Sequence, residues 1–490
     1  MATDVEDRVC VVGAGISGLV TAKVCLAEGF DVDIFEKTSG VGGTWHSSRT
    51  YPDLQTNDPR EMYRFADHPY PETTDEFPTA EQVRAYLESY ADRFGLRDDL
   101  SCKTEVVSIR RASERSGGRH ANFRVELQAA DSSRQPETRH YEYVIICNGV
   151  FSQPHIPAFD GLERFDGEVL HSSELTETDS IADKRVVIIG GGKSAYDCAS
   201  VAADYAASST LVFRSARWLV PRYFFGLRED WVLLHRLGQA FLPYHTKRGI
   251  AALLHEWGEP LVDLFWRSQS WMVHRAVDIP PEMTPDRSLP MGLEGVGVGT
   301  EVYRKVRAGE VEPKRAEISA FLDSHTLRLD TGETLKADVV VCATGWNQSL
   351  DFLGPELQPL VRDDGFFTLY RHILPPRERH LGFVGYASSI GTTLTSEAAA
   401  NWLAAFLRGR IDVPDVETME AQIEKVRAWA EKMLPGPSGG YFIGPYIVDY
   451  VDQLLIDMEI DPHQADNPIE EYVGRFHPER FREAWYGSAR

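Results

Sequence analysis

Cysteine, positive charge and long apolar runs are all scarce in this chain of 490 residues. Its six cysteines include no closely spaced pair, which excludes a disulfide scaffold and a zinc ribbon. Lys and Arg number 51 against 74 Asp and Glu, and the formal charge of −23 argues against a nucleic acid partner. No apolar run reaches the roughly 18 residues that a transmembrane helix needs. The acidic N-terminus lacks the basic segment and apolar core of a signal peptide, so we expect a soluble, cytoplasmic protein.

The composition is that of a large globular protein, and two of its segments resemble each other. With 43% hydrophobic residues, the chain can bury a core without a metal or a disulfide. Each segment has a short β-branched run, a glycine-rich turn and then a helical pattern: Arg8–Gly18 and Arg185–Ala195. The sequence therefore predicts an α/β fold with two Rossmann-like dinucleotide-binding domains and no metal site.

The first glycine turn carries the full signature of a dinucleotide site. Gly13 permits a tight turn, Gly15 lets a pyrophosphate approach the backbone, and Gly18 lets helix and strand pack closely. Unpaired N–H groups at the helix start attract phosphate. Glu36 ends the next predicted strand, where a carboxylate accepts hydrogen bonds from ribose hydroxyls. The predicted cofactor-binding residues here are Gly13, Ala14, Gly15, Ile16, Ser17, Gly18 and Glu36.

The second glycine turn differs from the first at the end of its following strand. That strand ends in Arg214, not in an acid, and Arg217 lies just beyond it. Arginine at this position suits the 2′-phosphate of NADPH; the alternative is a solvated residue at a strand end. The predicted cofactor-binding residues here are Gly190, Gly192, Lys193, Ser194, Ala195, Arg214, Ser215 and Arg217.

The hydrophobic pattern predicts further elements around these turns. We expect helices over 80–94, 397–408 and 415–433 (ended by Pro435), strands over 105–109, 122–127, 143–148 and 337–342, and a surface turn over 113–120. The proline-containing stretch 152–157 predicts that the chain crosses there from the first domain to the second. The strand that ends in Ala343-Thr344-Gly345 predicts the crossing back to the first domain. Segment 218–298 is aromatic and irregular; it either lines an apolar pocket or forms a peripheral hydrophobic surface.

Several motifs together resemble the flavin-containing monooxygenase family, with Baeyer–Villiger monooxygenases as relatives. They are the two glycine turns, Glu36-Lys-Thr-Ser-Gly-Val-Gly-Gly-Thr-Trp45, Leu54-Gln-Thr-Asn57, Phe165-x-Gly167-x-x-x-His171 and Ala343-Thr-Gly345. The resemblance implies FAD in the first site, NADPH in the second and a linker around His171. It adds Gly43, Thr44, Trp45, Thr56, Asn57, Thr344 and Gly345 as cofactor-binding residues. Leu175 and Ala399 depart from the family pattern, where an aromatic residue and a glutamine are usual.

The resemblance also implies a reaction. NADPH would reduce the flavin, O₂ would add to give a C4a-hydroperoxyflavin, and one oxygen atom would pass to an amine nitrogen or sulfur of a small molecule. The resemblance makes Asn57 the predicted catalytic residue, because it aligns with the family asparagine near the flavin edge and bound NADP⁺, and its amide both donates and accepts hydrogen bonds. The alternative is an asparagine that satisfies a turn beside Pro59.

Three alternatives stay open. The first is Baeyer–Villiger oxygenation of a ketone, which needs a cation; Arg49, Arg60 and Arg222 are candidates by proximity in the sequence. A flavin disulfide reductase would need a redox cysteine pair, which the sequence lacks. A flavin-binding regulator without catalysis is the third.

The domain prediction nests one nucleotide-binding domain inside the other. Residues 1–170 begin the FAD domain, 171–335 form the NADPH domain with the aromatic segment, and 336–490 return to the FAD domain and add C-terminal helices. The expected partners are a small-molecule substrate and O₂, with a homodimer as one open assembly.

Overall fold

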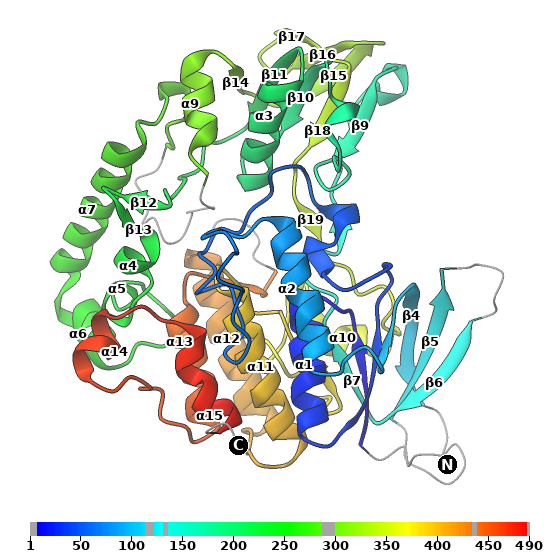
Figure 1. Cartoon of the computed structure of the whole chain (residues 1–490), viewed down its shortest axis with the longest axis vertical. Helices are drawn as coiled ribbons and strands as arrows, with labels where there is room; N and C mark the ends of the chain where they lie inside the picture. Colours follow the sequence, from blue (N-terminus) through cyan, green and yellow to red (C-terminus); the bar gives the residue numbers. More distant parts are fainter. Residues whose placement is uncertain (1–6, 113–121, 131–135, 287–298, 434–438, 488–490) are drawn as a thin grey trace.

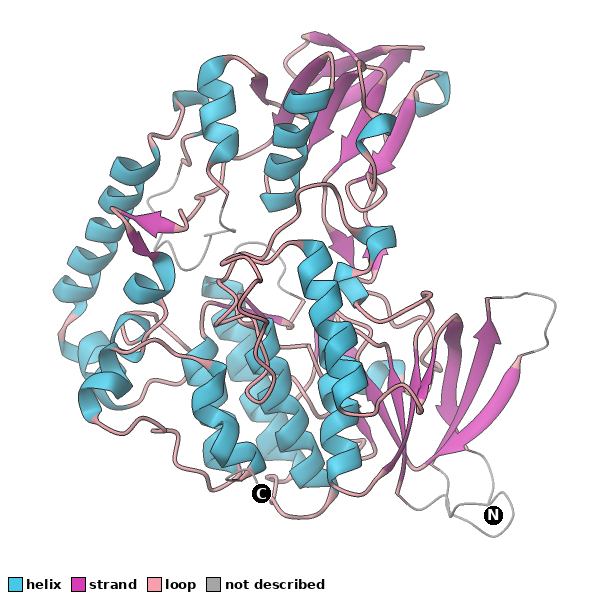
Figure 2. Ribbon diagram, viewed as in Figure 1, coloured by secondary structure: helices cyan, strands magenta, loops and turns pink. Residues whose placement is uncertain are grey.

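The computed structural model describes residues 7–112, 122–130, 136–286, 299–433 and 439–487 (Figure 1). Two five-stranded sheets organise them (Figure 2), and every pairing within these sheets is parallel. The first sheet has the order β22 (Leu381–Phe383), β7 (Tyr143–Ile146), β1 (Arg8–Val12), β2 (Asp31–Phe35), β3 (Leu100–Ser101). The second has the order β14 (Val311–Arg315), β11 (Ser208–Phe213), β10 (Arg185–Ile189), β18 (Val339–Cys342), β9 (Glu168–His171). The predicted α/β fold is confirmed.

The two sheets are built by the same sequence of elements. In each, the strand before the glycine turn is followed by a helix, a strand, further helical structure and another strand, and then by a three-stranded antiparallel meander. The strand after the meander then pairs with the first strand on its other side. The helices are α1 (Ile16–Ala27) and α2 (Ala80–Arg93), then α3 (Lys193–Tyr205) and α9 (Glu301–Ala308); the meanders are β4 (Thr104–Arg111), β5 (Phe123–Ala129), β6 (Glu137–Tyr141), and β15 (Ile318–Asp323), β16 (Thr326–Leu329), β17 (Thr334–Lys336).

The predicted domain boundary at 170/171 falls within β9, and the one at 335/336 falls just before β18. Strand β9 pairs with β18, and β18 pairs with β10, so both belong to the second sheet. The chain enters this sheet before Glu168 and leaves it after Cys342. The predicted return strand therefore exists but completes the inserted sheet.

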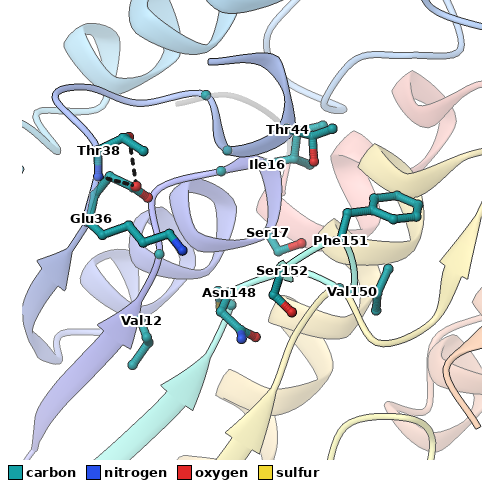
Figure 3. A pocket seen from close by; sticks show the side chains of 18 of the residues that line it. Val12, Ile16, Ser17, Glu36, Thr38, Thr44, Asn148, Val150, Phe151 and Ser152 are labelled. Carbon is teal, nitrogen blue, oxygen red and sulfur yellow. Dashed lines mark hydrogen bonds between the residues drawn. The ribbon is translucent and has the colours of Figure 1, made fainter. Parts of the chain in front are cut away.

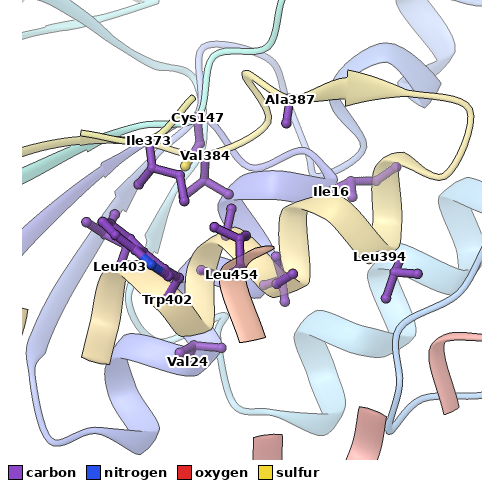
Figure 4. Packing of buried hydrophobic residues seen from close by; sticks show 14 of the residues in the cluster. Ile16, Val24, Cys147, Ile373, Val384, Ala387, Leu394, Trp402, Leu403 and Leu454 are labelled. Atoms are coloured by element: carbon purple, nitrogen blue, oxygen red, sulfur yellow. The ribbon is translucent and has the colours of Figure 1, made fainter. Parts of the chain in front are cut away.

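Both faces of β1 are buried, which explains its uninterrupted apolar run. Val9 and Val11 pack into the cluster under helices α1 and α11 (Thr392–Leu407), while Cys10 and Val12 face the meander β4–β6. Figure 4 shows Ile16, Val24, Trp402 and Leu454 within the helical cluster, where α1 and α11 lie against each other. Packing on both faces fixes the strand register and therefore where the glycine turn stands.

The helices observed agree with those expected, apart from their ends. Helix α2 begins at Ala80 behind a capping box between Thr79 and Gln82. Helix α11 begins at Thr392, directly after its N-cap residue Gly391 and before the predicted start at 397. Helix α12 (Val416–Met433) matches its prediction. The turn 113–120 and Pro435 lie outside the described residues.

The aromatic segment extends from the second sheet along one side of the molecule. It contains β12 (Tyr223–Phe224), β13 (Leu227–Arg228), α4 (Glu229–Leu233), α5 (Arg236–Gln239), α6 (Gly249–Trp257) and α7 (Glu259–Val277). Trp218 and Phe224 are buried, whereas Trp257 and Trp271 are 83% and 63% exposed. The chain ends in α13 (Ile447–Asp457), α14 (Pro468–Val473) and α15 (Arg482–Tyr486). Throughout the described ranges, every helix is too short or too polar to span a bilayer.

Candidate functional site

A cavity of about 500 Å³ opens at the carboxyl end of the first sheet, where β1, β2 and β7 end (Figure 3). This is the edge at which parallel α/β sheets bind nucleotides. The predicted residues that line it are Gly13, Gly15, Ile16, Ser17, Glu36, Gly43, Thr44 and Trp45. Ala14 and Gly18 lie next to these residues in the chain, and Thr56 and Asn57 lie in a later loop; none of the four is among the residues that line the cavity.

The glycines bring three backbones together. Gly13 has φ +103°, and a Cβ on it would lie 2.8 Å from the carbonyl oxygen of Cys147 at the end of β7. A Cβ on Gly43 would lie 3.0 Å from the Cα of Gly15, so these two loops meet backbone to backbone. A Cβ on Gly18 would overlap the carbonyl of Gly13 at 1.8 Å, which is the predicted packing role. Helix α1 starts here without a side-chain cap or an acid in its first turn, which leaves its N–H groups for an anion.

Glu36 both closes the turn and keeps acceptor capacity. It is 6% exposed. One carboxylate oxygen accepts a hydrogen bond from the Ala14 N–H at 2.9 Å, and the other accepts from the N–H and the hydroxyl of Thr38, each at 2.8 Å. A carboxylate has about four acceptor positions, so room for a ribose hydroxyl remains. Ala14 therefore acts on Glu36 through its backbone, and its N–H is not free for the nucleotide.

Asn57 carries a polar atom that the described protein residues leave unsatisfied. Its side-chain oxygen is buried and accepts no hydrogen bond from them. Such a group costs about 1–3 kcal/mol unless a ligand or water supplies a donor. The preceding Thr56 is 1% exposed, and its hydroxyl donates to the Asp58 carbonyl at 2.8 Å. The Thr56 hydroxyl thus uses its hydrogen within the loop and keeps only acceptor positions for a ligand.

Arg222 reaches from the aromatic segment to hold the Asn57 loop. Its guanidinium donates to the Gln55 side chain at 2.7 Å and to the Thr56 carbonyl at 3.2 Å, and lies 4.3 Å from the centre of the Phe77 ring. Burial near Asp230 also raises the pKa of Asp58 to about 8, so this carboxyl is largely protonated at neutral pH. Arg222 of the aromatic segment therefore holds the loop that carries Asn57.

The three arginines considered for a Baeyer–Villiger reaction lie in different places. Arg49 lines the cavity, donates to the carbonyl of Phe151 and lies 4.7 Å from the Trp346 ring centre. Arg60 donates to backbone carbonyls of the loop around Glu72, and Arg222 supports the Asn57 loop. Only Arg49 of the three faces the first cavity.

The second glycine turn repeats the geometry of the first. Gly190 has φ +145°, and a Cβ on it would lie 2.3 Å from the carbonyl oxygen of Ala343, at the end of the neighbouring strand β18. Gly192 precedes α3, which begins without a side-chain cap, and a Cβ on Gly192 would meet no atom within 4 Å. Ala195 is fully buried against Gly190, so it packs the turn.

The charged residues around this turn divide into free and paired groups. Arg214, Ser215 and Arg217 are exposed where β11 ends. No described residue forms a hydrogen bond or ion pair with the Arg214 or Arg217 guanidinium, so both are free to bind an anion. Lys193 forms an ion pair with Asp197 one turn along α3, and Ser194 follows it in the first turn.

Thr344 and Gly345 lie where the two connections between the sheets meet, not in the first cavity. The Thr344 hydroxyl donates to the carbonyl of His155. His171 is fully buried; its Nε2 donates to the Gly345 carbonyl at 2.9 Å, and its Nδ1 accepts from the Ser173 N–H at 3.2 Å. Burial lowers the pKa of His171, so the imidazole is neutral and both nitrogens are occupied. His171, at the end of β9, is therefore hydrogen-bonded to the connection that leads back to the first sheet.

The two departures from the family pattern lie in cores. Leu175 is 1% exposed in the cluster of the second sheet, and Ala399 is 2% exposed among the helices of the first. The six cysteines are all free, and five of them are buried.

Much of the cavity comes from segments that the motifs did not indicate. They are 104–107, 147–153, 349–352 and the residues Gly385, Ser388 and Thr392. The Asn148-Gly149 pair directly after the buried strand β7 was a detectable signal, because ligands bind at the carboxyl ends of such strands. The segments after residue 348 reach the cavity through long-range folding alone.

Comparisons with known proteins agree with this geometry. The family model described as "FMO-like: Flavin-binding monooxygenase-like" matches residues 6–465. The FAD-dependent monooxygenase rstn6 of Aspergillus nomiae is 27% identical, over 97% of this chain and 96% of its own. Flavin-containing monooxygenase 1 of Homo sapiens is also 27% identical, over 93% of this chain and 84% of its own.

Solved structures share the architecture. S-allyl-L-cysteine S-oxygenase from Allium sativum has a TM-score of 0.63 at 23% identity, covering 97% of this chain and 93% of its own. Cyclohexanone-bound cyclohexanone monooxygenase has a TM-score of 0.67 at 19% identity, covering 92% and 96%. At these identities the likeness establishes the fold.

Proposed function

Because the chain belongs to the flavin-binding monooxygenase-like family, we propose that it transfers one oxygen atom from O₂ to an amine nitrogen or a sulfur of a small molecule. Family membership confirms the predicted flavin monooxygenase class and its cofactors, FAD and NADPH. The repeated glycine turn, followed by an acid in the first sheet and by free arginines in the second, supports the two cofactors. The finer proposal is supported by the 26% identity to an N-oxide-forming dimethylaniline monooxygenase of Oryctolagus cuniculus.

We assign FAD to the first cavity. The start of α1 and the Gly15–Gly43 approach would hold its pyrophosphate, and the remaining acceptor positions of Glu36 would hold a ribose hydroxyl. The bound flavin supplies hydride acceptance from NADPH and activation of O₂. The protein's own part is to bind and orient the ring and to keep water from it.

We assign NADPH to the second turn. The uncapped start of α3 after Gly192 would hold the pyrophosphate, and Arg214 with Arg217 would pair with the 2′-phosphate. Free guanidinium groups in a chain of charge −23 form a local anion site. This arrangement favours NADPH over NADH.

Asn57 is the proposed catalytic residue. Its buried oxygen needs a donor, and its amide nitrogen can donate, so the side chain can orient a group that both gives and accepts hydrogen bonds. Arg222 positions this side chain through its hydrogen bonds to the loop. The pair explains why a loop outside the glycine turns matters for the reaction.

A second candidate function is Baeyer–Villiger oxygenation of a ketone. The observation in its favour is Arg49, whose guanidinium lines the first cavity and could stabilise an anionic oxygen that attacks a carbonyl. Amine or sulfur oxygenation requires no such cation, so the substrate panel below separates the two reactions.

The test begins with the absorption spectrum of the purified protein, followed by NADPH and air. Oxygen uptake and products are then measured with a tertiary amine, a sulfide and a cyclic ketone. We expect N-oxide or sulfoxide as the main product. Lactone or ester from the ketone, with no heteroatom oxidation, would overturn the proposal in favour of the second candidate. A bound flavin that NADPH does not bleach would contradict both and support a regulator.

The Asn57→Ala variant tests the catalytic assignment. We expect it to retain FAD and to consume NADPH, but to release H₂O₂ in place of oxygenated product, because the group that orients the oxygen is lost. Asn57→Ala with the parent's ratio of product to NADPH consumed would refute the role of Asn57.

A further inference from the structure

A second cavity, of about 220 Å³, lies between the aromatic segment and the C-terminal helices. It is enclosed by α5 and the start of α6 on one side and by α13 on the other. Figure 1 shows these helices together at the edge of the molecule, below the second sheet. The cavity shares no lining residue with the first one. It is therefore a separate space, smaller than a drug-sized pocket and suited to a molecule of a few heavy atoms.

One wall of this cavity is a closed ion-pair network. Arg236 is 7% exposed and forms ion pairs with Asp452 and Glu471, and it donates to the carbonyl of Pro462 at 2.6 Å. The guanidinium is thus neutralised by two carboxylates. Arg236 cannot serve as a free anion-binding group.

Two acceptor groups of the cavity have no partner within the described part of the chain. The carboxylate of Asp449, on the inner side of α13, has no hydrogen bond and no ion pair within the described part of the chain. Gln239 on α5 is 3% exposed, and its side-chain oxygen is buried without a donor. The Arg248 guanidinium also lines the cavity without a partner among the described residues, but Arg248 is an exposed residue that water can hydrate. The less exposed unsatisfied groups, Asp449 and Gln239, are both acceptors, so the complementary ligand is a donor, and an unpaired carboxylate favours a positively charged one.

The remaining lining suits a short alkyl group. Ile250, Val448 and Ile456 contribute apolar side chains, and Ala240 and Ala251 leave room between them. The described residues hold no group of three or more His, Cys, Asp or Glu side chains with metal-binding geometry, which argues against a metal ion. A cation with an alkyl body is the better fit.

We propose that this cavity binds the ammonium group of a small alkylamine, with Asp449 as its counter-ion and Gln239 accepting a second N–H hydrogen bond. The site joins the aromatic segment to the FAD domain, because Gln239 belongs to one and Asp449 to the other. Binding therefore cross-links two parts of the chain that are far apart in sequence.

The charge of Asp449 makes this binding depend on pH. Burial and the neighbouring Asp452 raise the pKa of Asp449 to about 7, while Arg236 on α5 and Arg248 before α6 oppose the rise. His463 also lines the cavity, and Glu471 on α14 faces it through Arg236. An alkylammonium binds the ionised carboxylate, so affinity is low below pH 6 and rises as Asp449 loses its proton. Between pH 6 and pH 8 the ionised fraction rises about tenfold.

The experiment is titration calorimetry of the FAD-loaded protein with butylammonium, and with butan-1-ol as the neutral isostere. We expect saturable binding of butylammonium only, with an affinity about tenfold higher at pH 8 than at pH 6. Asp449→Asn should weaken binding at least tenfold. The matched control is Asp466→Asn, which removes an exposed carboxylate outside the cavity and should leave the affinity unchanged.

Several outcomes would overturn the proposal. They are no binding of butylammonium, equal binding of the alcohol, unchanged affinity in Asp449→Asn, or an affinity independent of pH. Amine binding at the proposed catalytic site would survive Asp449→Asn, so that result points to the first cavity. The pH series uses the unaltered protein and holds even if a variant fails to fold. These measurements report binding and do not depend on turnover, so they test the amine site independently of the proposed oxygenation.

Discussion

The substitution Gly192→Ala separates coenzyme binding from folding at the second turn. Gly192 has φ −102° and ψ −179°, which alanine adopts readily, and a Cβ there meets no atom within 4 Å. The variant should be about as stable as the parent, since alanine restricts the unfolded chain by about 0.4–1 kcal/mol but is a poorer N-cap residue for α3 than glycine. The added methyl group would nevertheless occupy the space that the NADPH pyrophosphate needs. We expect KM for NADPH to rise at least tenfold, which corresponds to about 1.4 kcal/mol.

The contrasting variant is Gly190→Ala. Its Cβ would lie 2.3 Å from the Ala343 carbonyl, and φ +145° adds backbone strain of about 1–3 kcal/mol. This variant should lose stability as well as coenzyme affinity. The assays are the thermal unfolding midpoint, the FAD content and the KM for NADPH. A Gly192→Ala protein with normal stability and an unchanged KM would refute the placement of the coenzyme phosphates against α3.

Three further substitutions test other parts of the argument. Arg214→Ala should raise the KM for NADPH with little change for NADH, because only NADPH carries the 2′-phosphate; equal losses in steady-state assays would count against the assignment. Arg222→Ala should lower the product formed per NADPH, measured with H₂O₂ release, without loss of FAD; unaltered coupling would show that the Asn57 loop needs no such support. Burial raises the pKa of Glu397 to about 7. The unfolded chain therefore loses this proton more readily than the folded one, and the free energy of unfolding falls as pH rises from about 4.5 to 7. Glutamine does not ionise, so between pH 5 and pH 8 the free energy of unfolding of Glu397→Gln should rise relative to that of the parent by up to about 3 kcal/mol. A difference in thermal unfolding that stays constant over this pH range would contradict this.

The buried strands before the two turns and the close backbone contacts of the turn glycines could be predicted from the sequence. The strands before Gly13 and Gly190 are apolar on both faces, and the turn glycines are required by close backbone contacts, so both features leave strong local signals. The capping box at Thr79 likewise marks a helix start in the sequence. Such features depend on residues a few positions apart.

Long-range pairing was harder to predict. The run Val339–Cys342 reads as a buried strand, but nothing local shows that it pairs with β10 and not with a strand of the first sheet. The hydrogen bond from the Ala14 N–H to Glu36 joins residues 22 positions apart, so the local pattern of the turn did not indicate it. Burial of the Asn57 oxygen and the reach of Arg222 could be seen only in three dimensions.

The nesting of one sheet inside the other has a consequence for synthesis on the ribosome. All strands of the inserted sheet have been made once Cys342 is translated, whereas the first sheet waits for β22, and α1 waits for α11 to cover it. The N-terminal strand and helix are thus made first and completed last. Contacts of such long sequence separation form slowly, and the apolar surface of α1 stays open in the meantime. A growing chain of this protein should therefore rely on chaperones most strongly while the inner sheet is already folded.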